Sequence, residues 1–296
     1  MEKINTVLAA LDLEAGGDAV LARAVQLASA HAAWLVVLHV IEAEPLPPTA
    51  AHMNLTESEL RATFERQAIA AIETQLIEND RTRRTDVRVA FGSPHEVITH
   101  VAREQHADVV VVGPGKGRTL KDKILGSTAD RVIRASAAPV LVVRKPSAEP
   151  YRSVTVAIDG SPLSARAFTE VRRLVPDAAL QLVHAADIPL TFQQALLRAG
   201  TSQAEMERYR ATRADKAREE LSTFQRALPG AETFPVHVLD GEPGPALVRL
   251  SKSARLDLLA LGSHGRGAAL QALLGSVARR VLGQASCDVL VVPGRQ

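Results

Sequence analysis

A glycine-rich stretch in the second half of the chain has the residue types and spacing of a phosphate-binding loop. Glycine lets backbone N–H groups approach an anion closely, and a serine where a helix begins adds its hydroxyl to the free amides of the first turn. The stretch reads Gly262-Ser-His-Gly265-Arg-Gly-Ala-Ala-Leu-Gln-Ala-Leu-Leu-Gly275-Ser276. Its candidate phosphate neighbours are Gly262, His264, Gly265, Arg266, Gly267, Gly275 and Ser276.

A related loop lies 149 residues earlier, with Gly113, Lys116, Gly126 and Ser127 at the matching positions. In a single loop of this kind the glycines usually serve only a turn and the serine only a helix cap. Here the spacing recurs in both halves, each time after a strand pattern and before a helical one, which favours phosphate binding. Neither loop has the Walker A pattern or the Gly-x-Gly-x-x-Gly pattern.

An aspartate ends the first apolar run of each half, Asp12 in the first and Asp159 in the second. Ligands of an open parallel sheet bind beyond the carboxyl ends of its strands, where the strand order reverses. If the first strand of each half neighbours the strand that ends in the glycine loop, the aspartate and the loop face one crevice. The second half continues as Asp159-Gly160-Ser161, whereas Asp12 is followed by a leucine and Glu14.

The spacing of these features indicates one domain that occurs twice. The offsets are 149 residues for the glycine loops, 147 for the aspartates and 145 for His39 and His184. Short apolar runs alternate with helical patterns, which predicts an α/β fold: two tandem, doubly wound, Rossmann-like sheets of five parallel strands. The expected domains are 1–146 and 151–296, joined by a polar stretch with two prolines.

The expected elements follow from the same alternation. Strands are expected at residues 4–11, 33–41, 85–91, 108–113 and 139–144, and again at 152–158, 179–186, 234–239, 257–262 and 288–293. The expected helices of the first half cover residues 17–31, 57–79, 94–105 and 127–136.

The composition excludes several classes of protein. The 296 residues fit two domains. The 35 lysines and arginines nearly balance 33 acidic residues, and only six Phe, two Tyr and one Trp are present, so nucleic acid is not an expected partner. The single cysteine, Cys287, excludes an intrachain disulfide and a Cys-rich zinc site. Without a signal peptide or an apolar stretch near 20 residues, a cytoplasmic protein away from membranes is expected.

Catalytic and metal-binding side chains do not cluster in the sequence. The nine histidines form no His-x-x-x-His pair, so no metal site is expected. His39 and His184 each end a second strand, and we interpret them as hydrogen-bonded crevice residues rather than catalysts. No nucleophile elbow of the Gly-x-Ser-x-Gly type occurs. We therefore expect no catalytic residue.

The aspartates, the glycine loops and the final apolar runs together resemble the universal stress protein family in its tandem form. The resemblance covers residues 1–144 and 151–293, and the second loop matches the family's Gly-x2-Gly-x9-Gly-Ser/Thr pattern. It implies an adenine nucleotide alpha hydrolase-like fold that binds ATP, AMP or ADP, with Mg²⁺ as a candidate companion. The aspartate would lie near the base and ribose, and the loop around the phosphates. The resemblance also implies pairing of domains through their last strands, Leu141 to Val143 and Leu290 to Val292, within one chain or in a homodimer.

The two halves are expected to bind nucleotide unequally. Lys116 replaces the second glycine of the loop, and a non-glycine residue in left-handed backbone costs roughly 1–2 kcal/mol. Lysine also offers phosphate a point charge. Glu14 adds a like charge, which costs about 4 kcal/mol at roughly 4 Å and an effective dielectric constant of about 20. We expect the second half to bind nucleotide, while the first binds weakly or serves structure.

Three functions remain open from the sequence. The leading one is a regulatory stress-response protein in which nucleotide occupancy biases conformation or partner binding. The second is an ATP-using enzyme with slow hydrolysis, for which no positioned base can be named. The third is a nucleotide-free scaffold for dimerisation and partner binding, which Lys116 favours in the first half and the intact second loop disfavours.

Overall fold

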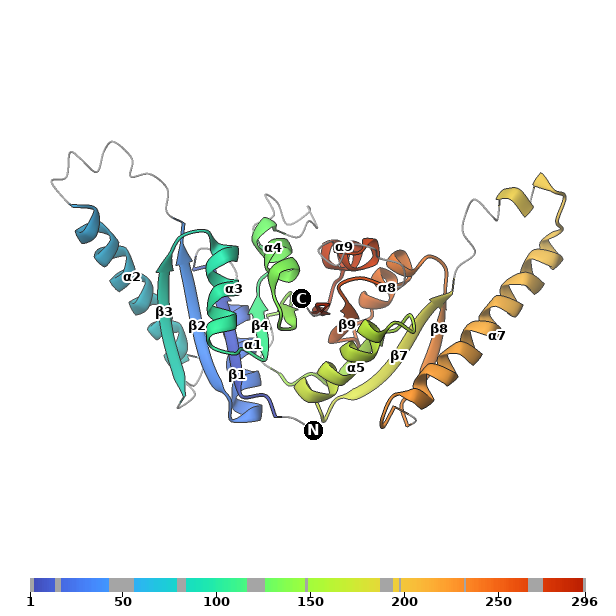
Figure 1. Cartoon of the computed structure of the whole chain (residues 1–296), viewed down its shortest axis with the longest axis horizontal. Helices are drawn as coiled ribbons and strands as arrows, with labels where there is room; N and C mark the ends of the chain where they lie inside the picture. Colours follow the sequence, from blue (N-terminus) through green and yellow to red (C-terminus); the bar gives the residue numbers. More distant parts are fainter. Residues whose placement is uncertain are drawn as a thin grey trace. The chain divides into compact units, whose positions relative to one another are not determined.

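The computed structural model describes residues 3–13, 17–42, 56–78, 84–115, 126–146, 149–186, 194–196, 198–231, 233–265 and 274–294. The chain divides into two compact units, Met1–Pro150 and Tyr151–Gln296. Strands alternate with helices through both units, in blue to green for the first and in yellow to red for the second (Figure 1). Both units have the same order of strands.

The first unit has five parallel strands in the order β3-β2-β1-β4-β5. β1 lies between β2 and β4, so the strand order reverses beside β1. The strands are β1 (Thr6–Leu11), β2 (Trp34–Ile41), β3 (Thr85–Phe91), β4 (Val109–Val112) and β5 (Val140–Val142). The helices are α1 (Gly17–His31), α2 (Glu57–Glu78), α3 (Pro94–Glu104) and α4 (Ser127–Ala135).

The second unit repeats this arrangement in the order β8-β7-β6-β9-β10, again with every described pairing parallel. Here the order reverses beside β6. The strands are β6 (Ser153–Ala157), β7 (Ala179–Ala186), β8 (Val236–Asp240), β9 (Leu258–Gly262) and β10 (Asp288–Val292). The main helices are α5 (Pro162–Leu174), α7 (Gln203–Ala227), α8 (Pro243–Ser251) and α9 (Ser276–Gln284).

The central strands are buried on both faces, as their unbroken apolar sequences predict. Every residue of β4 and β10 is buried, and Cys287, directly before β10, is 0% exposed. The predicted fold class is therefore confirmed, and the expected strand ends agree with the observed ones within two residues.

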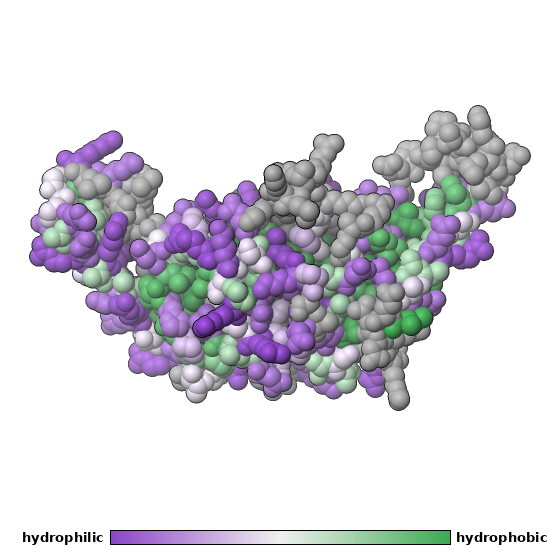
Figure 2. Space-filling view, turned by 180° about the vertical axis from the view of Figure 1, so that it is seen from behind, coloured by the Kyte–Doolittle hydropathy of each residue, from purple (hydrophilic) through white to green (hydrophobic). Residues whose placement is uncertain are grey.

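Helix α7 is largely exposed by comparison. It packs against β7 and β8, and only Met206, Ala217 and Leu221 are buried along its length. On the face drawn in Figure 2, hydrophilic side chains predominate along this helix. Among the helices that the structure describes, none combines the length and the apolar character needed to cross a bilayer.

An aspartate before the fourth strand of each unit anchors the start of the first strand. Asp108 Oδ2 accepts hydrogen bonds from the backbone N–H groups of Asn5 and Thr6 at 2.7 and 3.0 Å. Asp257 Oδ2 accepts from Arg152 and Ser153 at 2.9 and 3.0 Å. The carboxylate thereby sets the relative position of two strands whose opposite ends carry the candidate site residues.

Replacing Asp257 with alanine is expected to lower the free energy of unfolding by about 1–3 kcal/mol, because two backbone donors lose a charged acceptor. Urea denaturation followed by circular dichroism would measure the change. Asp177→Ala, in an exposed turn of the same unit, is the matched control. A midpoint for Asp257→Ala equal to that of the control would contradict the anchoring role.

Candidate functional site

The aspartates and the glycine loops lie on neighbouring strands in both units. Asp12 follows β1 and Gly113 follows β4, and these two strands pair in parallel up to Ala10 and Val112. Asp159 comes two residues after β6, and Gly262 is the last residue of β9, which pairs with β6. Each aspartate therefore lies with a glycine loop at the carboxyl ends of the strands, beside the point where the strand order reverses.

In the second unit the Asp159 carboxylate is held in place and closely approached by the loop. The Ser161 N–H donates to Asp159 Oδ1 at 2.9 Å, and Gly160 makes the intervening turn with a φ of +76°. Ser161 then caps α5, since its hydroxyl oxygen accepts from the Ser164 N–H at 3.2 Å. A Cβ at Gly265 would lie 2.6 Å from Asp159 Oδ2.

This contact gives a steric reason for the second loop glycine. Gly265 is not in the left-handed region, so the expected cost of left-handed backbone does not apply to it. A side chain there would force the Asp159 carboxylate or the loop to move, because the Cβ position lies 2.6 Å from Asp159 Oδ2. Gly262 is restricted in the same way, since a Cβ there would lie 2.7 Å from Leu163 Cγ of α5.

In both loops an equivalent backbone hydrogen bond joins the two ends of the loop, at a point that we call its neck. The Gly275 N–H donates to Ser263 O at 2.8 Å, and the Gly126 N–H donates to Pro114 O at 2.7 Å. In the first unit the neck needs two glycines: Gly115 has a φ of +84°, and a Cβ at Gly126 would lie 2.7 Å from its Cα. The interiors of the loops, with Lys116, Arg266 and Gly267, lie outside the described residues, as does Glu14.

The helices that follow the loops begin at Ser127 and Ser276, with Gly126 and Gly275 as their N-cap residues. The alternative that the serines cap these helices is therefore wrong, and neither N-cap has a side-chain hydrogen bond. Both serines are exposed at the first helical position. Their hydroxyls and the first-turn amides, which have no acceptor within the helix, lie together where an anion can bind.

The charge of the first turn differs between the two helices, which the sequence analysis missed. In α4 the turn contains Asp130, whose carboxylate pairs with Arg134 at 2.8 Å. The first turn of α9 has no acidic residue, and Arg279 stands at the position that matches Asp130. Arg279 Nη2 donates to Leu274 O at 3.4 Å, so its guanidinium lies over the start of the helix. The 149-residue offset was the signal that could have found this difference.

The two crevice histidines make the same contact in their respective units. His39 Nδ1 lies 2.9 Å from Leu11 O, and His184 Nδ1 lies 2.7 Å from Ile158 O. Because a carbonyl oxygen only accepts, Nδ1 carries the proton in both side chains. The interpretation of these residues as hydrogen-bonded is confirmed. They satisfy the carbonyl group directly before each aspartate.

One serine links His264 to the segment that follows β10. Its Nδ1 lies 3.0 Å from Ser263 Oγ, which also accepts from the Gly294 N–H at 3.4 Å. Nowhere in the described ranges do three or more His, Cys, Asp or Glu side chains gather as a metal site would require.

Comparison with known proteins identifies the family. The model of the universal stress protein family matches residues 3–144 and again residues 150–293. The chain belongs to the universal stress protein family. The two matches cover both units, so this universal stress protein contains the family domain twice in tandem.

Curated relatives share this tandem length. Universal stress protein Rv2005c of Mycobacterium tuberculosis is 30% identical over 275 residues, which cover 87% of this chain and 86% of the relative. A universal stress protein of Mycolicibacterium smegmatis is 30% identical over 301 residues, which cover 98% of this chain and 97% of the relative.

Solved structures share the fold. A universal stress protein from Archaeoglobus fulgidus matches with a TM-score of 0.67 and 18% identity, covering 99% of both chains. Protein PA1789 from Pseudomonas aeruginosa, described as functionally unknown, matches with a TM-score of 0.66 and 19% identity, covering 98% of this chain and 93% of that one.

Proposed function

We propose that this tandem universal stress protein binds ATP or a related adenine nucleotide in its second unit. It would act as a stress-response regulator in the cytoplasm rather than as a fast enzyme. The observation that carries the proposal is the close approach of Gly265 to Asp159, with a Cβ position only 2.6 Å from the carboxylate. It brings the Asp159 carboxylate, which can accept hydrogen bonds from hydroxyl groups, next to the glycine loop. That loop ends at the start of α9, where no side chain caps the helix.

The residues present fit an adenine nucleotide. The Asp159 carboxylate accepts hydrogen bonds only, which suits the hydroxyls of a ribose. Gly262, Gly265 and Gly275 allow backbone amides to approach phosphate oxygens, and the Ser276 hydroxyl adds a further donor. Mg²⁺, if it accompanies the nucleotide, would take most of its ligands from phosphate oxygens and water.

The remaining expectations belong to the same proposal. The first unit, with Asp12, Gly113, Gly126 and Ser127, would bind nucleotide weakly or serve structure. Domains would pair through their final strands, within the chain or in a homodimer, and thereby satisfy strand edges. Nucleotide occupancy would bias this pairing or the binding of a further protein.

Denaturing the purified full chain is expected to release an adenine nucleotide, detected by anion-exchange chromatography of the supernatant. Protein stripped of nucleotide should then bind ATP in isothermal titration calorimetry. Asp177→Ala, in an exposed turn of the same unit, is the control and should release and bind as much nucleotide as the wild type. Release of no nucleotide together with no heat of binding would reject the proposal and favour the nucleotide-free scaffold.

A turnover assay separates the regulator from the enzyme. With Mg²⁺ and saturating ATP we expect phosphate release far slower than the usual enzyme median of about 10 per second. The reason is that the sequence contains no recognisable motif that would position a general base. A turnover number near that median would overturn this part of the proposal.

A further inference from the structure

A short segment after β10, Pro293 and Gly294, crosses the neck of the second glycine loop; we name it the strap. The ladder between β9 and β10 continues past the strands, since the Ser263 N–H donates to Val292 O at 2.9 Å. The Gly294 N–H then donates to Ser263 Oγ at 3.4 Å. A Cβ at Gly294 would lie 2.8 Å from His264 Cε1, so the strap lies directly against the imidazole.

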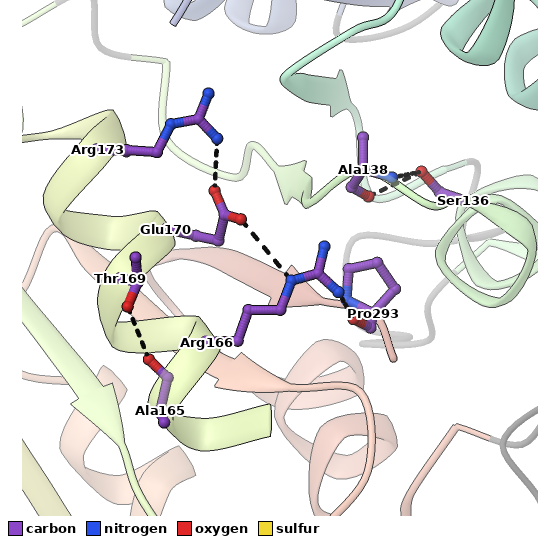
Figure 3. A network of polar contacts seen from close by, with 8 residues as sticks. All are labelled: Ser136, Ala138, Ala165, Arg166, Thr169, Glu170, Arg173 and Pro293. Atoms are coloured by element: carbon purple, nitrogen blue, oxygen red, sulfur yellow. Dashed lines mark hydrogen bonds and ion pairs between the residues drawn. The ribbon is translucent and has the colours of Figure 1, made fainter. Parts of the chain in front are cut away.

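Helix α5 holds the strap through one arginine. Arg166 Nη1 donates to Pro293 O at 2.6 Å (Figure 3). Its Nε lies 3.8 Å from Glu170 Oε1, and the other oxygen of Glu170 pairs with Arg173 at 3.0 Å. These three side chains are between 13% and 24% exposed, so the arrangement is only partly screened by water.

The same helix begins at the aspartate of the site. Ser161, which donates its N–H to Asp159, is the N-cap of α5, and Arg166 lies just over one turn further along. One helix therefore contacts both walls of the crevice. It supports Asp159 through its N-cap residue, and it supports His264 and the loop neck through Arg166 and the strap.

The first unit, whose glycine loop is incomplete, lacks these parts. Pro114 stands where the second unit has Ser263, and proline has neither the N–H nor the hydroxyl that contacts the strap. Gly115 stands in place of His264, and Lys145 in place of Gly294. At the 147-residue offset, Ala19 of α1 matches Arg166. The residues that make the strap contacts are therefore present in the second unit, which has the complete glycine loop, and are replaced in the first.

We propose that Arg166 is a positioning residue for the nucleotide site of the second unit. By bonding Pro293 it holds Gly294 against His264 and sets the neck of the glycine loop relative to Asp159. The inference rests on the proposed nucleotide binding for its effect on affinity. The position of the His264 ring tests it without any nucleotide.

Arg166→Ala in the full chain is expected to weaken ATP binding about tenfold in isothermal titration calorimetry, a size usual for residues that act through others. Arg166→Lys, which keeps one donor for Pro293 O, should recover part of the loss. Arg173→Ala is the matched control: it removes the same charge and an ion pair with Glu170 but leaves the Arg166–Pro293 hydrogen bond. It should bind ATP as the wild type does.

Gly294→Ala is the second variant, because its Cβ would displace the His264 ring without changing any charge. It should also weaken ATP binding about tenfold, and the double variant should lose no more than either single one, since both act through one contact. In nucleotide-free protein, the NMR signal of His264 Cε1–H, assigned with His264→Gln, should shift in Arg166→Ala and Gly294→Ala but not in Arg173→Ala.

The outcomes separate this inference from the proposed function. Wild-type protein that binds no ATP rejects the proposed function, and the NMR signal then decides whether the strap positions His264. Wild-type affinity in Arg166→Ala with an unmoved His264 signal overturns the role of Arg166 and leaves nucleotide binding intact. Equal losses in Arg166→Ala and Arg173→Ala also overturn it, because charge alone would explain them.

Discussion

Gly265→Val is expected to weaken ATP binding by the full chain at least about a hundredfold, which corresponds to a loss of about 2.8 kcal/mol in binding free energy. A Cβ at this position would lie 2.6 Å from Asp159 Oδ2, nearer than such atoms approach in proteins. Either the carboxylate must turn away and break its 2.9 Å bond with the Ser161 N–H, or the loop must move outward. Both changes separate the groups proposed to hold the ribose and the phosphates.

Calorimetry with ATP measures this loss, and circular dichroism shows whether the variant is folded. Gly115→Val is the matched control in the first unit, where a Cβ would collide with Gly126 Cα at 2.7 Å. It disturbs a loop of the same design and should leave the affinity for ATP unchanged. Wild-type affinity in Gly265→Val would mean that nucleotide does not bind between the loop and Asp159.

The fold was predictable because each element has a local pattern that agrees with its place in the sheet. Val109 to Val112 form an unbroken β-branched run, which suits a strand covered on both faces, and all four residues are buried. Because the pattern recurs at a near-constant offset, the elements of the second unit could be predicted from those of the first. Helix α1 was predicted with the bounds it has, Gly17–His31.

The details of the site depend on contacts between distant residues, which leave no local pattern. Gly265 was predicted from the spacing of the loop, but its close approach to Asp159, more than a hundred residues earlier, appears only in the folded chain. Gly294 and Pro293 are unremarkable in sequence, and their contacts with His264 and Arg166 appear only once β9 and β10 are paired. Ser276 was placed correctly at the start of a helix, but one position past the N-cap.

One nucleotide per chain, rather than two, is the second result expected with a large effect. Asp159→Ala should remove nearly all of the bound nucleotide, and Asp12→Ala should leave the amount unchanged. The two aspartates occupy the same place beside β4 and β9, respectively, so the pair of variants compares equivalent positions in the two units.

The charges at the helix starts give the physical reason for the difference. An acidic residue in the first turn of a helix stabilises it by about 0.3–1 kcal/mol through the helix dipole. In α4 Asp130 already supplies that negative charge, and a phosphate would have to compete with it. In α9 the first turn has no acid and Arg279 lies over it, an arrangement that is unfavourable until an anion binds.

Reversing the charge of Arg279 tests whether the charge of the first helical turn affects nucleotide binding. Arg279→Asp should weaken ATP binding more strongly at low salt than at high salt, since exposed charges are screened over a Debye length of about 10 Å at 0.1 M salt. Arg280→Asp, the neighbouring exposed arginine on α9, is the matched control and should have the smaller effect, because Arg280 pairs with Glu242 at 3.9 Å. Two nucleotides bound per wild-type chain, or equal losses in Asp12→Ala and Asp159→Ala, would contradict the asymmetry between the units.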